Sequence, residues 1–224
     1  MNPKLFNKDY LLHLCQKYGL KPGKKYGQNF LLDAEVIETM VMAGEVNKKD
    51  TVVEVGPGFG VLTFALADQA KKVVAFEIEK KLQPYWASFC HPERSEGSAL
   101  KNLEIVWGNV LKEFPISNFQ FSNYKVIANL PYQITSHVIR TFLELENPPQ
   151  MMVLMVQKEV AERICAKAGD MSLLAVAAQY YADAEIAATV PRNLFWPAPA
   201  VDSAVIKLTT HVIPPTKYGG IQSD

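Results

Sequence analysis

The residues best suited to chemistry are Asn129, Leu130, Pro131 and Tyr132, which follow the apolar run 124–128. The Asn129 side-chain oxygen and the backbone carbonyl of Leu130 or Pro131 can accept hydrogen bonds from both N–H groups of a planar amino group, which leaves its nitrogen facing an electrophile. Proline fixes its own φ and so helps to aim these carbonyls out of a strand end. The Tyr132 ring offers a flat face on which an extruded base can stack. The alternative interpretation is a turn that only ends a strand.

A glycine loop earlier in the chain is a candidate cofactor site. The β-branched run 51–55 leads directly into Gly56, Gly58 and Gly60, and glycines permit positive φ and close approach of a ligand to the backbone. The spacing is G-x-G-x-G and not the G-x-G-x-x-G of dinucleotide folds, and an acid, Glu54, precedes it. Such a loop suits S-adenosylmethionine (SAM), whose zwitterionic methionine end needs close backbone contact but carries no pyrophosphate.

An acidic residue after the next apolar run supports this interpretation. The run 72–76 ends at Glu77, at a distance from the loop of roughly twenty residues, which is typical of a βαβ unit. A carboxylate at the end of a strand can accept hydrogen bonds from both ribose hydroxyls. The loop and the acid together predict a SAM site.

Alternating strand and helix patterns predict the scaffold that positions these residues. We expect strands near 51–55, 72–76, 103–107, 124–128 and 150–156, and helices near 61–70, 78–89, 134–145 and 158–168. This alternation predicts a parallel sheet covered by helices on both faces. Further helices are expected at 8–18, at 33–44 with Asp33 as its N-cap, and near 172–181, before two strands near 184–190 and 203–210 that a proline-rich loop joins.

Five sequence blocks, in order, resemble those of the KsgA-type ribosomal RNA adenine dimethyltransferases, and the resemblance runs from about Lys24 to about Thr210. The blocks are YGQNFL (26–31), EVGPGFG (54–60), NLPYQITS (129–136), VQKEVAER (156–163) and FWPAPAVDSAV (195–205). The third also matches the (N/D/S)-(P/I/L)-P-(Y/F/W) signature of enzymes that methylate exocyclic amino groups. The resemblance implies an α/β fold of the class I SAM-dependent methyltransferases, with a Rossmann-like, mostly parallel seven-stranded sheet and helices on both faces.

The resemblance also implies roles for individual cofactor-binding residues. By it, Asn29 and Leu31 contact the methionine and adenosine parts of SAM. Gly56, in the loop that also contains Gly58, lies against the methionine, and Glu77 holds the ribose.

One position departs from the family pattern. Where the family has an Asp that accepts a hydrogen bond from the cofactor's adenine amino group, this chain has Asn109. Asparagine keeps an acceptor oxygen but lacks the charge. A hydrogen bond to a charged acceptor contributes roughly 1.5–3 kcal/mol, against about 1 kcal/mol for a neutral one, so we expect weaker SAM binding.

The resemblance implies that Asn129 faces the transferable methyl group and the target base, and that Phe195 packs near that base. Direct methyl transfer needs no strong base, because the pKa of the amino nitrogen falls as it attacks the sulfonium and water can take the proton. Positioning therefore carries the catalysis.

The expected activity is SAM-dependent dimethylation of adenine N6 amino groups in a 3′-end hairpin of small-subunit (16S) ribosomal RNA during ribosome biogenesis. Two alternatives stay open. One is an adenine N6-methyltransferase of large-subunit ribosomal RNA, of the macrolide-resistance type. The other is a non-catalytic RNA-binding assembly factor, which Asn109 and the short C-terminus would suit.

Charge and domain organisation bear on the partner. The 23 Lys and Arg residues balance 23 Asp and Glu residues, whereas nucleic-acid-binding proteins usually carry a basic excess. Lysines gather in residues 1–25, however, and we expect a basic N-terminal arm there that contacts RNA, with solvated helix faces as the alternative. A methyltransferase domain is expected at 26–210 and a tail at 211–224. The family's helical C-terminal domain does not follow, which leaves a truncated gene, a fragment or a reduced form as alternatives.

Cysteines and hydropathy bear on the compartment and on metals. Three widely spaced cysteines disfavour a disulfide framework. Cys90 and His91 open a polar insertion, 90–99, but two ligands without a second pair do not make a metal site, so we expect no metal. We found neither an apolar run of about eighteen residues nor a signal-peptide core. We therefore expect a cytoplasmic monomer with no membrane association and with ribosomal RNA or the small ribosomal subunit as its partner.

Overall fold

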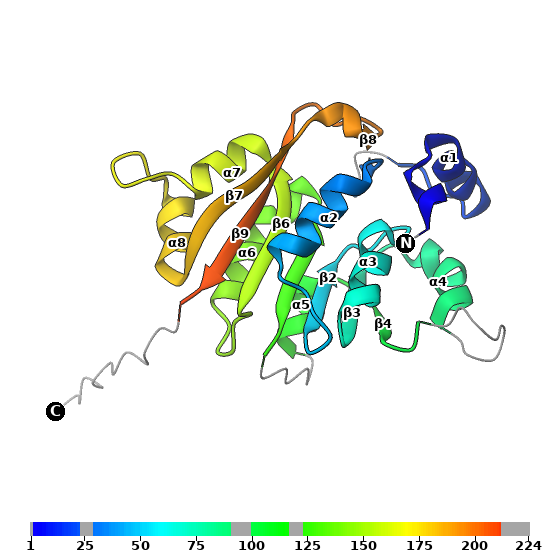
Figure 1. Cartoon of the computed structure of the whole chain (residues 1–224), viewed down its shortest axis with the longest axis horizontal. Helices are drawn as coiled ribbons and strands as arrows, with labels where there is room; N and C mark the ends of the chain where they lie inside the picture. Colours follow the sequence, from blue (N-terminus) through cyan, green and yellow to red (C-terminus); the bar gives the residue numbers. More distant parts are fainter. Residues whose placement is uncertain (1, 23–28, 91–99, 117–122, 212–224) are drawn as a thin grey trace.

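A seven-stranded sheet forms the centre of the molecule (Figure 1). The computed structural model describes residues 2–22, 29–90, 100–116 and 123–211. In sheet order the strands are β4 (Leu103–Trp107), β3 (Lys72–Glu77), β2 (Thr51–Val55), β5 (Lys125–Asn129), β6 (Met151–Gln157), β9 (Ser203–Thr210) and β7 (Ala182–Val190). Strand β9 runs antiparallel to both of its neighbours, whereas the other pairings in this sheet are parallel. The expected mostly parallel sheet is confirmed.

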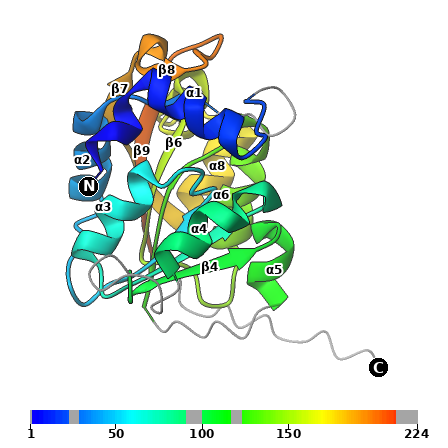
Figure 2. The ribbon, with the colours of Figure 1, turned by 90° about the vertical axis from the view of Figure 1, so that its right-hand side faces the viewer.

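Helices cover both faces of the sheet (Figures 1 and 2). One face packs against α2 (Ala34–Ala43), α3 (Val61–Gln69) and α4 (Gln83–Cys90), and α1 (Lys8–Lys17) joins the same core cluster from the end of the sheet; the other face packs against α5 (Val110–Ile116), α6 (Thr135–Leu143), α7 (Lys158–Ile164) and α8 (Leu173–Tyr181). Successive strand residues point to opposite faces, so Val52 joins the first core cluster and Val53 the second.

Most of the predicted elements are confirmed, and the differences include the following three. Helix α4 begins after a 3-10 turn at Lys80–Leu82, because the Glu79 carboxylate accepts a hydrogen bond from the Lys81 N–H and caps that turn. Helix α5 was not predicted. Nor was the two-stranded antiparallel ladder of β1 (Phe30–Leu31) and β8 (Phe195–Trp196), since two residues are too few to show an alternating pattern.

The β1–β8 ladder brings the first and the last of the five sequence blocks together. Phe30 pairs with Trp196 and Leu31 with Phe195. The Phe30 and Trp196 rings are stacked, with centroids 6.1 Å apart and planes inclined by 20°. These contacts hold both segments above the carboxyl ends of the parallel strands.

The N-terminal segment packs onto the same end of the molecule (Figure 2). Helix α1 starts at the Asn7 cap and buries Leu11 and Leu14 in the first core cluster. The exposed lysines of α1 and of the residues that flank it are Lys4, Lys8, Lys17 and Lys21. RNA contact by this segment stays a prediction. The rest of the proposed arm, residues 91–99 of the predicted insertion 90–99 and the tail beyond His211 lie outside the described residues.

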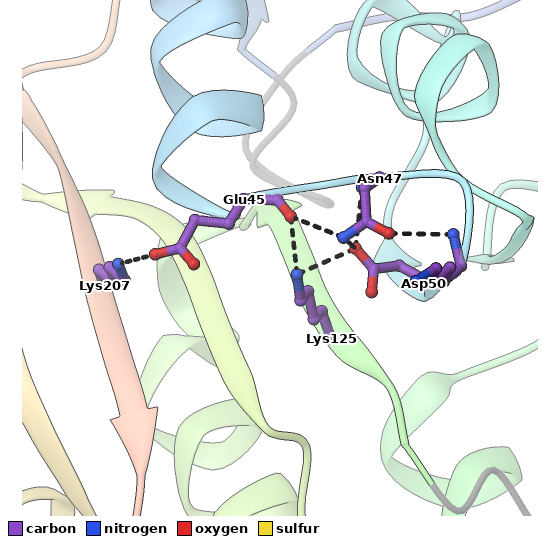
Figure 3. A network of polar contacts seen from close by, with 6 residues as sticks. Glu45, Asn47, Asp50, Lys125 and Lys207 are labelled. Carbon is purple, nitrogen blue, oxygen red and sulfur yellow. Dashed lines mark hydrogen bonds and ion pairs between the residues drawn. The ribbon is translucent and has the colours of Figure 1, made fainter.

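A polar network ties the α2–β2 loop to the opposite end of the sheet (Figure 3). Lys125, at the start of β5, is 8% exposed; its Nζ lies 2.9 Å from Asp50 Oδ2 and donates to the Glu45 carbonyl over 2.9 Å. The Glu45 carboxylate accepts a hydrogen bond of 2.8 Å from Lys207 Nζ. The network is far from the strand ends at which the predicted site residues gather.

Candidate cofactor and base site

The predicted site residues meet in a cavity at the carboxyl ends of β2, β3 and β5, as expected for an open α/β sheet. Ten of the eleven predicted residues line this cavity: Asn29, Leu31, Gly56, Gly58, Glu77, Asn129, Leu130, Pro131, Tyr132 and Phe195. The eleventh, Asn109, lies in an adjacent cavity that shares Gly56, Ile78 and Pro131 with the first.

The glycine loop has the geometry of a ligand cradle. Gly56 has a φ of 71°, and a Cβ built there would meet no atom within 4 Å, so space beside the backbone is open to a ligand. Gly60 must be a glycine for a different reason: a Cβ at this position would lie only 2.7 Å from the Trp86 ring. The Trp86 indole N–H in turn donates to the Gly58 carbonyl over 3.0 Å. The loop is thus packed on one side and open on the other.

Glu77 is buried but well supplied with donors. It is 3% exposed, its Oε2 accepts from the Gly58 N–H over 3.0 Å and its Oε1 accepts from the Glu79 N–H over 2.8 Å. Burial raises the pKa of this carboxyl, and the backbone donors oppose that rise. Each carboxylate oxygen has a second lone pair, so Glu77 can also accept from the two hydroxyls of a ribose.

Glu54 is a second buried acid in this cavity, and the sequence assigned it no role. It is 2% exposed, and its Oε2 has no hydrogen-bond partner in the structure. Burial, with a smaller contribution from the Glu77 charge, raises the pKa of Glu54 to about 8, and the nearby Thr63 hydroxyl opposes this rise. In the sequence, Glu54 is simply an acid within the apolar strand 52–55. That pattern alone does not tell whether the acid is buried or exposed.

The tetrapeptide 129–132 ends β5 and turns into a 3-10 helix at Tyr132–Ile134. The Leu130 N–H donates to the Met155 carbonyl of β6 over 3.2 Å, which fixes the turn to the neighbouring strand. The Pro131 carbonyl accepts from the Ile134 N–H over 3.1 Å. One of the two backbone acceptors that the sequence left open is therefore already engaged.

Tyr132 is held by a residue that the sequence did not single out. Its hydroxyl lies 2.8 Å from Ser203 Oγ, at the start of β9, and the serine is fully buried. Burial raises the pKa of the Tyr132 phenol, while the hydrogen bond to Ser203 opposes that rise. The ring beside Asn129 is thus anchored at its far end to the reversed strand.

The Asn109 side chain caps the start of α5. Its Oδ1 accepts from the Leu111 N–H over 3.0 Å, at the start of α5. The cavity around it includes the apolar side chains of Ile78, Val110 and Ile134, which suit a flat heteroaromatic ring. Its role toward an adenine stays a prediction.

No group of three or more His, Cys, Asp or Glu side chains in residues 2–22, 29–90, 100–116 and 123–211 could hold a metal ion. In the same ranges no helix is long and apolar enough to cross a membrane. His91 lies outside them.

A glycine loop after β2, an acid at the end of β3 and a mostly parallel seven-stranded sheet with one reversed strand define a class I SAM-dependent methyltransferase. The sequence model of one family, ribosomal RNA adenine dimethylase, matches residues 19–219. The chain belongs to that family and is a SAM-dependent enzyme.

Individual relatives agree with this assignment. The chain is similar to "Ribosomal RNA small subunit methyltransferase A" of Geobacillus thermodenitrificans, with 42% identity covering 90% of this chain and 69% of the relative. With the protein of that name from Dehalococcoides mccartyi it shares 40% identity, covering 87% and 65%. The chain therefore spans about two thirds of the length of these curated relatives.

Two solved structures share the fold and part of the sequence. A dimethyladenosine transferase from Plasmodium falciparum superposes with a TM-score of 0.70 at 30% identity, covering 81% of this chain and 63% of that chain. The 23S rRNA methyltransferase ErmE gives 0.69 at 29% identity, covering 83% and 71%.

Proposed function

We propose that this chain dimethylates adenine N6 amino groups in a 3′-end hairpin of small-subunit (16S) ribosomal RNA. One observation carries the proposal: Asn129 and Tyr132 line the same cavity as Gly56 and Glu77. The acceptors for an amino group therefore lie within reach of a cofactor on the glycine loop. The curated relatives named for the small subunit support that choice of RNA.

The cofactor part of the cavity would hold SAM along its length. Glu77 would accept the ribose hydroxyls, and the open backbone at Gly56 would receive the methionine portion, with Asn29 and Leu31 beside it. The apolar cavity around Asn109 would take the adenine ring. Bound there, SAM supplies an electrophilic methyl group.

The remaining residues would position the target adenine. Asn129 Oδ1 would accept one N–H of the amino group, and the Leu130 carbonyl would accept the other, since one of the two lone pairs of the Pro131 carbonyl is already used by the Ile134 N–H. Tyr132 and Phe195 would lie against the target base. Stacking of a base on an aromatic ring contributes about 1–3 kcal/mol. No side chain need act as a strong base, since positioning carries the step.

The nearest alternative is methylation of a large-subunit adenine with the same residues. The similarity to ErmE, at 29% identity, favours it. The higher identity to the small-subunit relatives, about 40% over most of the chain, favours the first proposal.

Further parts of the proposal concern the molecule as a whole. We propose a basic RNA-contacting segment at 1–25, a methyltransferase domain at 26–210 and a tail at 211–224, in a cytoplasmic monomer. The exposed lysines of the N-terminal segment support RNA contact there, because each phosphate contact strengthens binding in a salt-dependent way.

The test is methyl transfer from labelled SAM to unmethylated small and large ribosomal subunits, followed by mapping of the product. We expect N6,N6-dimethyladenine in the small-subunit RNA, and no transfer by Asn129→Ala despite retained SAM binding. Label confined to the large subunit would favour the alternative. A chain that binds SAM but labels neither subunit would be a non-catalytic binding protein.

A further inference from the structure

Two aromatic side chains of α4 hold the glycine loop on its packed side. The Tyr85 hydroxyl donates to the Phe59 carbonyl over 2.8 Å. The Trp86 indole N–H donates to the Gly58 carbonyl over 3.0 Å. Two consecutive carbonyls of the loop therefore accept from two consecutive residues of one helix. Neither aromatic residue is among the described residues that line the cofactor cavity, so both can act on a ligand only through the loop.

The loop depends on such anchors from outside. Gly56, Gly58 and Gly60 have φ values of 71°, 55° and 89°, and glycine can leave this region of backbone conformation more easily than any other residue. None of the three has a side chain that could fix the loop from within. A buried carbonyl that loses its donor is costly, so the two α4 donors favour the one conformation in which the Gly58 and Phe59 carbonyls face α4.

That conformation is also the one that prepares the cavity. The Gly58 N–H donates to Glu77 Oε2 over 3.0 Å, while the Gly58 carbonyl accepts from Trp86. The backbone at Gly58 is thus fixed on both sides, and a rotation there would break both hydrogen bonds. Trp86 consequently helps to orient the carboxylate that would accept the ribose hydroxyls.

The two donors are themselves held firmly. Tyr85 is 5% exposed and Trp86 is 1% exposed. The Tyr85 ring meets the rings of Phe59 and of Tyr18, just beyond α1, edge-on, with centroids 5.2 Å and 5.7 Å away. The Trp86 ring packs against Phe64 of α3, with centroids 5.8 Å apart. Rings from three segments therefore make α4 a fixed support for the loop.

We propose that Tyr85 and Trp86 are positioning residues that keep the glycine loop in its binding conformation and so raise SAM affinity without contacting SAM. The proposal rests on the proposed placement of SAM on this loop. A loop that is competent for only a fraction of the time binds with an affinity reduced by that fraction. Loss of an anchor should therefore raise Kd, whereas the complex, in which the ligand orders the loop, should change little.

Tyr85→Phe tests the proposal, because it removes one hydroxyl and keeps the ring. Calorimetric titration should show the Kd for SAM rising about 2–10-fold, the range for one neutral hydrogen bond. Tyr124→Phe is the matched control: Tyr124 is 3% exposed and its hydroxyl donates to the Asn147 carbonyl over 3.1 Å, at the end of β5 opposite to Asn129. It should lower the melting temperature similarly and leave SAM affinity unchanged. An unchanged Kd in Tyr85→Phe, or an equal rise in both variants, would overturn the proposal.

Amide hydrogen exchange of residues 56–60 separates a prepared loop from general stability. In the ligand-free state, exchange should be faster in Tyr85→Phe and in Trp86→Phe than in the parent chain, and with saturating SAM the three proteins should exchange alike. If Trp86→Phe does not fold, Tyr85→Phe alone carries the comparison. Equal exchange in the ligand-free parent and Tyr85→Phe would contradict the proposal.

Kinetics and one further variant complete the test. In methyl transfer, Tyr85→Phe should raise the KM for SAM while kcat at saturating SAM stays within about twofold of the parent; a fall in kcat at constant KM would overturn a positioning role. Glu77→Ala distinguishes the two levels of the argument. Weaker SAM binding in Glu77→Ala but not in Tyr85→Phe counts against the anchors only, whereas unchanged binding in both removes SAM from the loop as well.

Discussion

The backbone N–H of Gly58 donates a hydrogen bond of 3.0 Å to Glu77 Oε2, so the loop after β2 and the acid at the end of β3 are linked before any ligand arrives. The second oxygen of Glu77 is fixed by the Glu79 N–H. The ribose acceptor is therefore oriented in advance, which lowers the entropic cost of binding.

Replacing Glu77 by Ala should weaken SAM binding by about 1.5–3 kcal/mol, the range for a hydrogen bond to a charged group. The variant removes the expected ribose acceptor and also one anchor of the glycine loop. Calorimetric titration measures the effect. Glu104→Ala removes an exposed carboxylate that pairs with Lys72 outside the cavity, and it should change nothing; unchanged affinity in Glu77→Ala would remove Glu77 from the site.

Asn109→Asp should tighten SAM binding, because aspartate restores a charged acceptor. It should also stabilise α5 modestly, since Asp is as good an N-cap as Asn and its charge favours a helix N-terminus. Affinity and melting temperature measured together separate the two effects. A higher melting temperature with unchanged or weaker SAM binding would mean that Asn109 serves α5 alone.

Ser203→Ala and Tyr132→Phe should slow methyl transfer to a similar, small extent, since each removes the same hydrogen bond and keeps the ring. Such a bond contributes about 0.5–1.5 kcal/mol. The double variant should be no worse than either single one, because interacting partners are not additive. Tyr132→Ala should lose more, since stacking is lost too. Additive effects on kcat/KM would show that Ser203 acts independently of Tyr132.

The stability of the parent chain should fall with rising pH relative to Glu54→Gln. The pKa of Glu54 is raised from 4.5 to about 8 on folding, so between these values the folded state holds a proton that the unfolded state has lost. The free energy of unfolding of the parent should therefore decline, relative to the variant, by about 1.4 kcal/mol per pH unit in this window. Denaturant unfolding at pH 6, 7 and 8 measures it, and a constant difference would show that Glu54 ionises normally.

Lys125→Met should destabilise the fold by about 1.5–3 kcal/mol, because Asp50 loses its charged partner in a largely buried place. Denaturant unfolding measures the loss. Adding Asp50→Asn should recover part of it, since the unpaired charge is then gone. SAM affinity should stay the same, because Lys125 starts β5 and the cavity lies at the other end of that strand, at Asn129; a large loss of affinity would mean that the two ends are coupled.

The sequence predicted the sheet and the site unevenly, for physical reasons. Long strands with apolar runs and the helices between them carry a periodic signal, and the glycine loop and Glu77 carry a spacing signal. The β1–β8 ladder, the Tyr132–Ser203 hydrogen bond and the exposed or buried state of Glu54 depend on contacts between distant segments. Such contacts leave no local pattern, so only the structure places them.

The position of β9 has a consequence for synthesis. It is the last of the described strands along the chain, yet it lies between β6 and β7. On the ribosome, β7 emerges before β9 and has no partner strand until residues 203–210 follow, so both β6 and β7 present open edges in the nascent chain. The glycine loop, Glu77 and Asn129 precede β7 in the chain, so they have already emerged from the ribosome by then. Strand β9, which carries Ser203, is therefore the last of the described strands to emerge, and only then can Ser203 form its hydrogen bond with Tyr132.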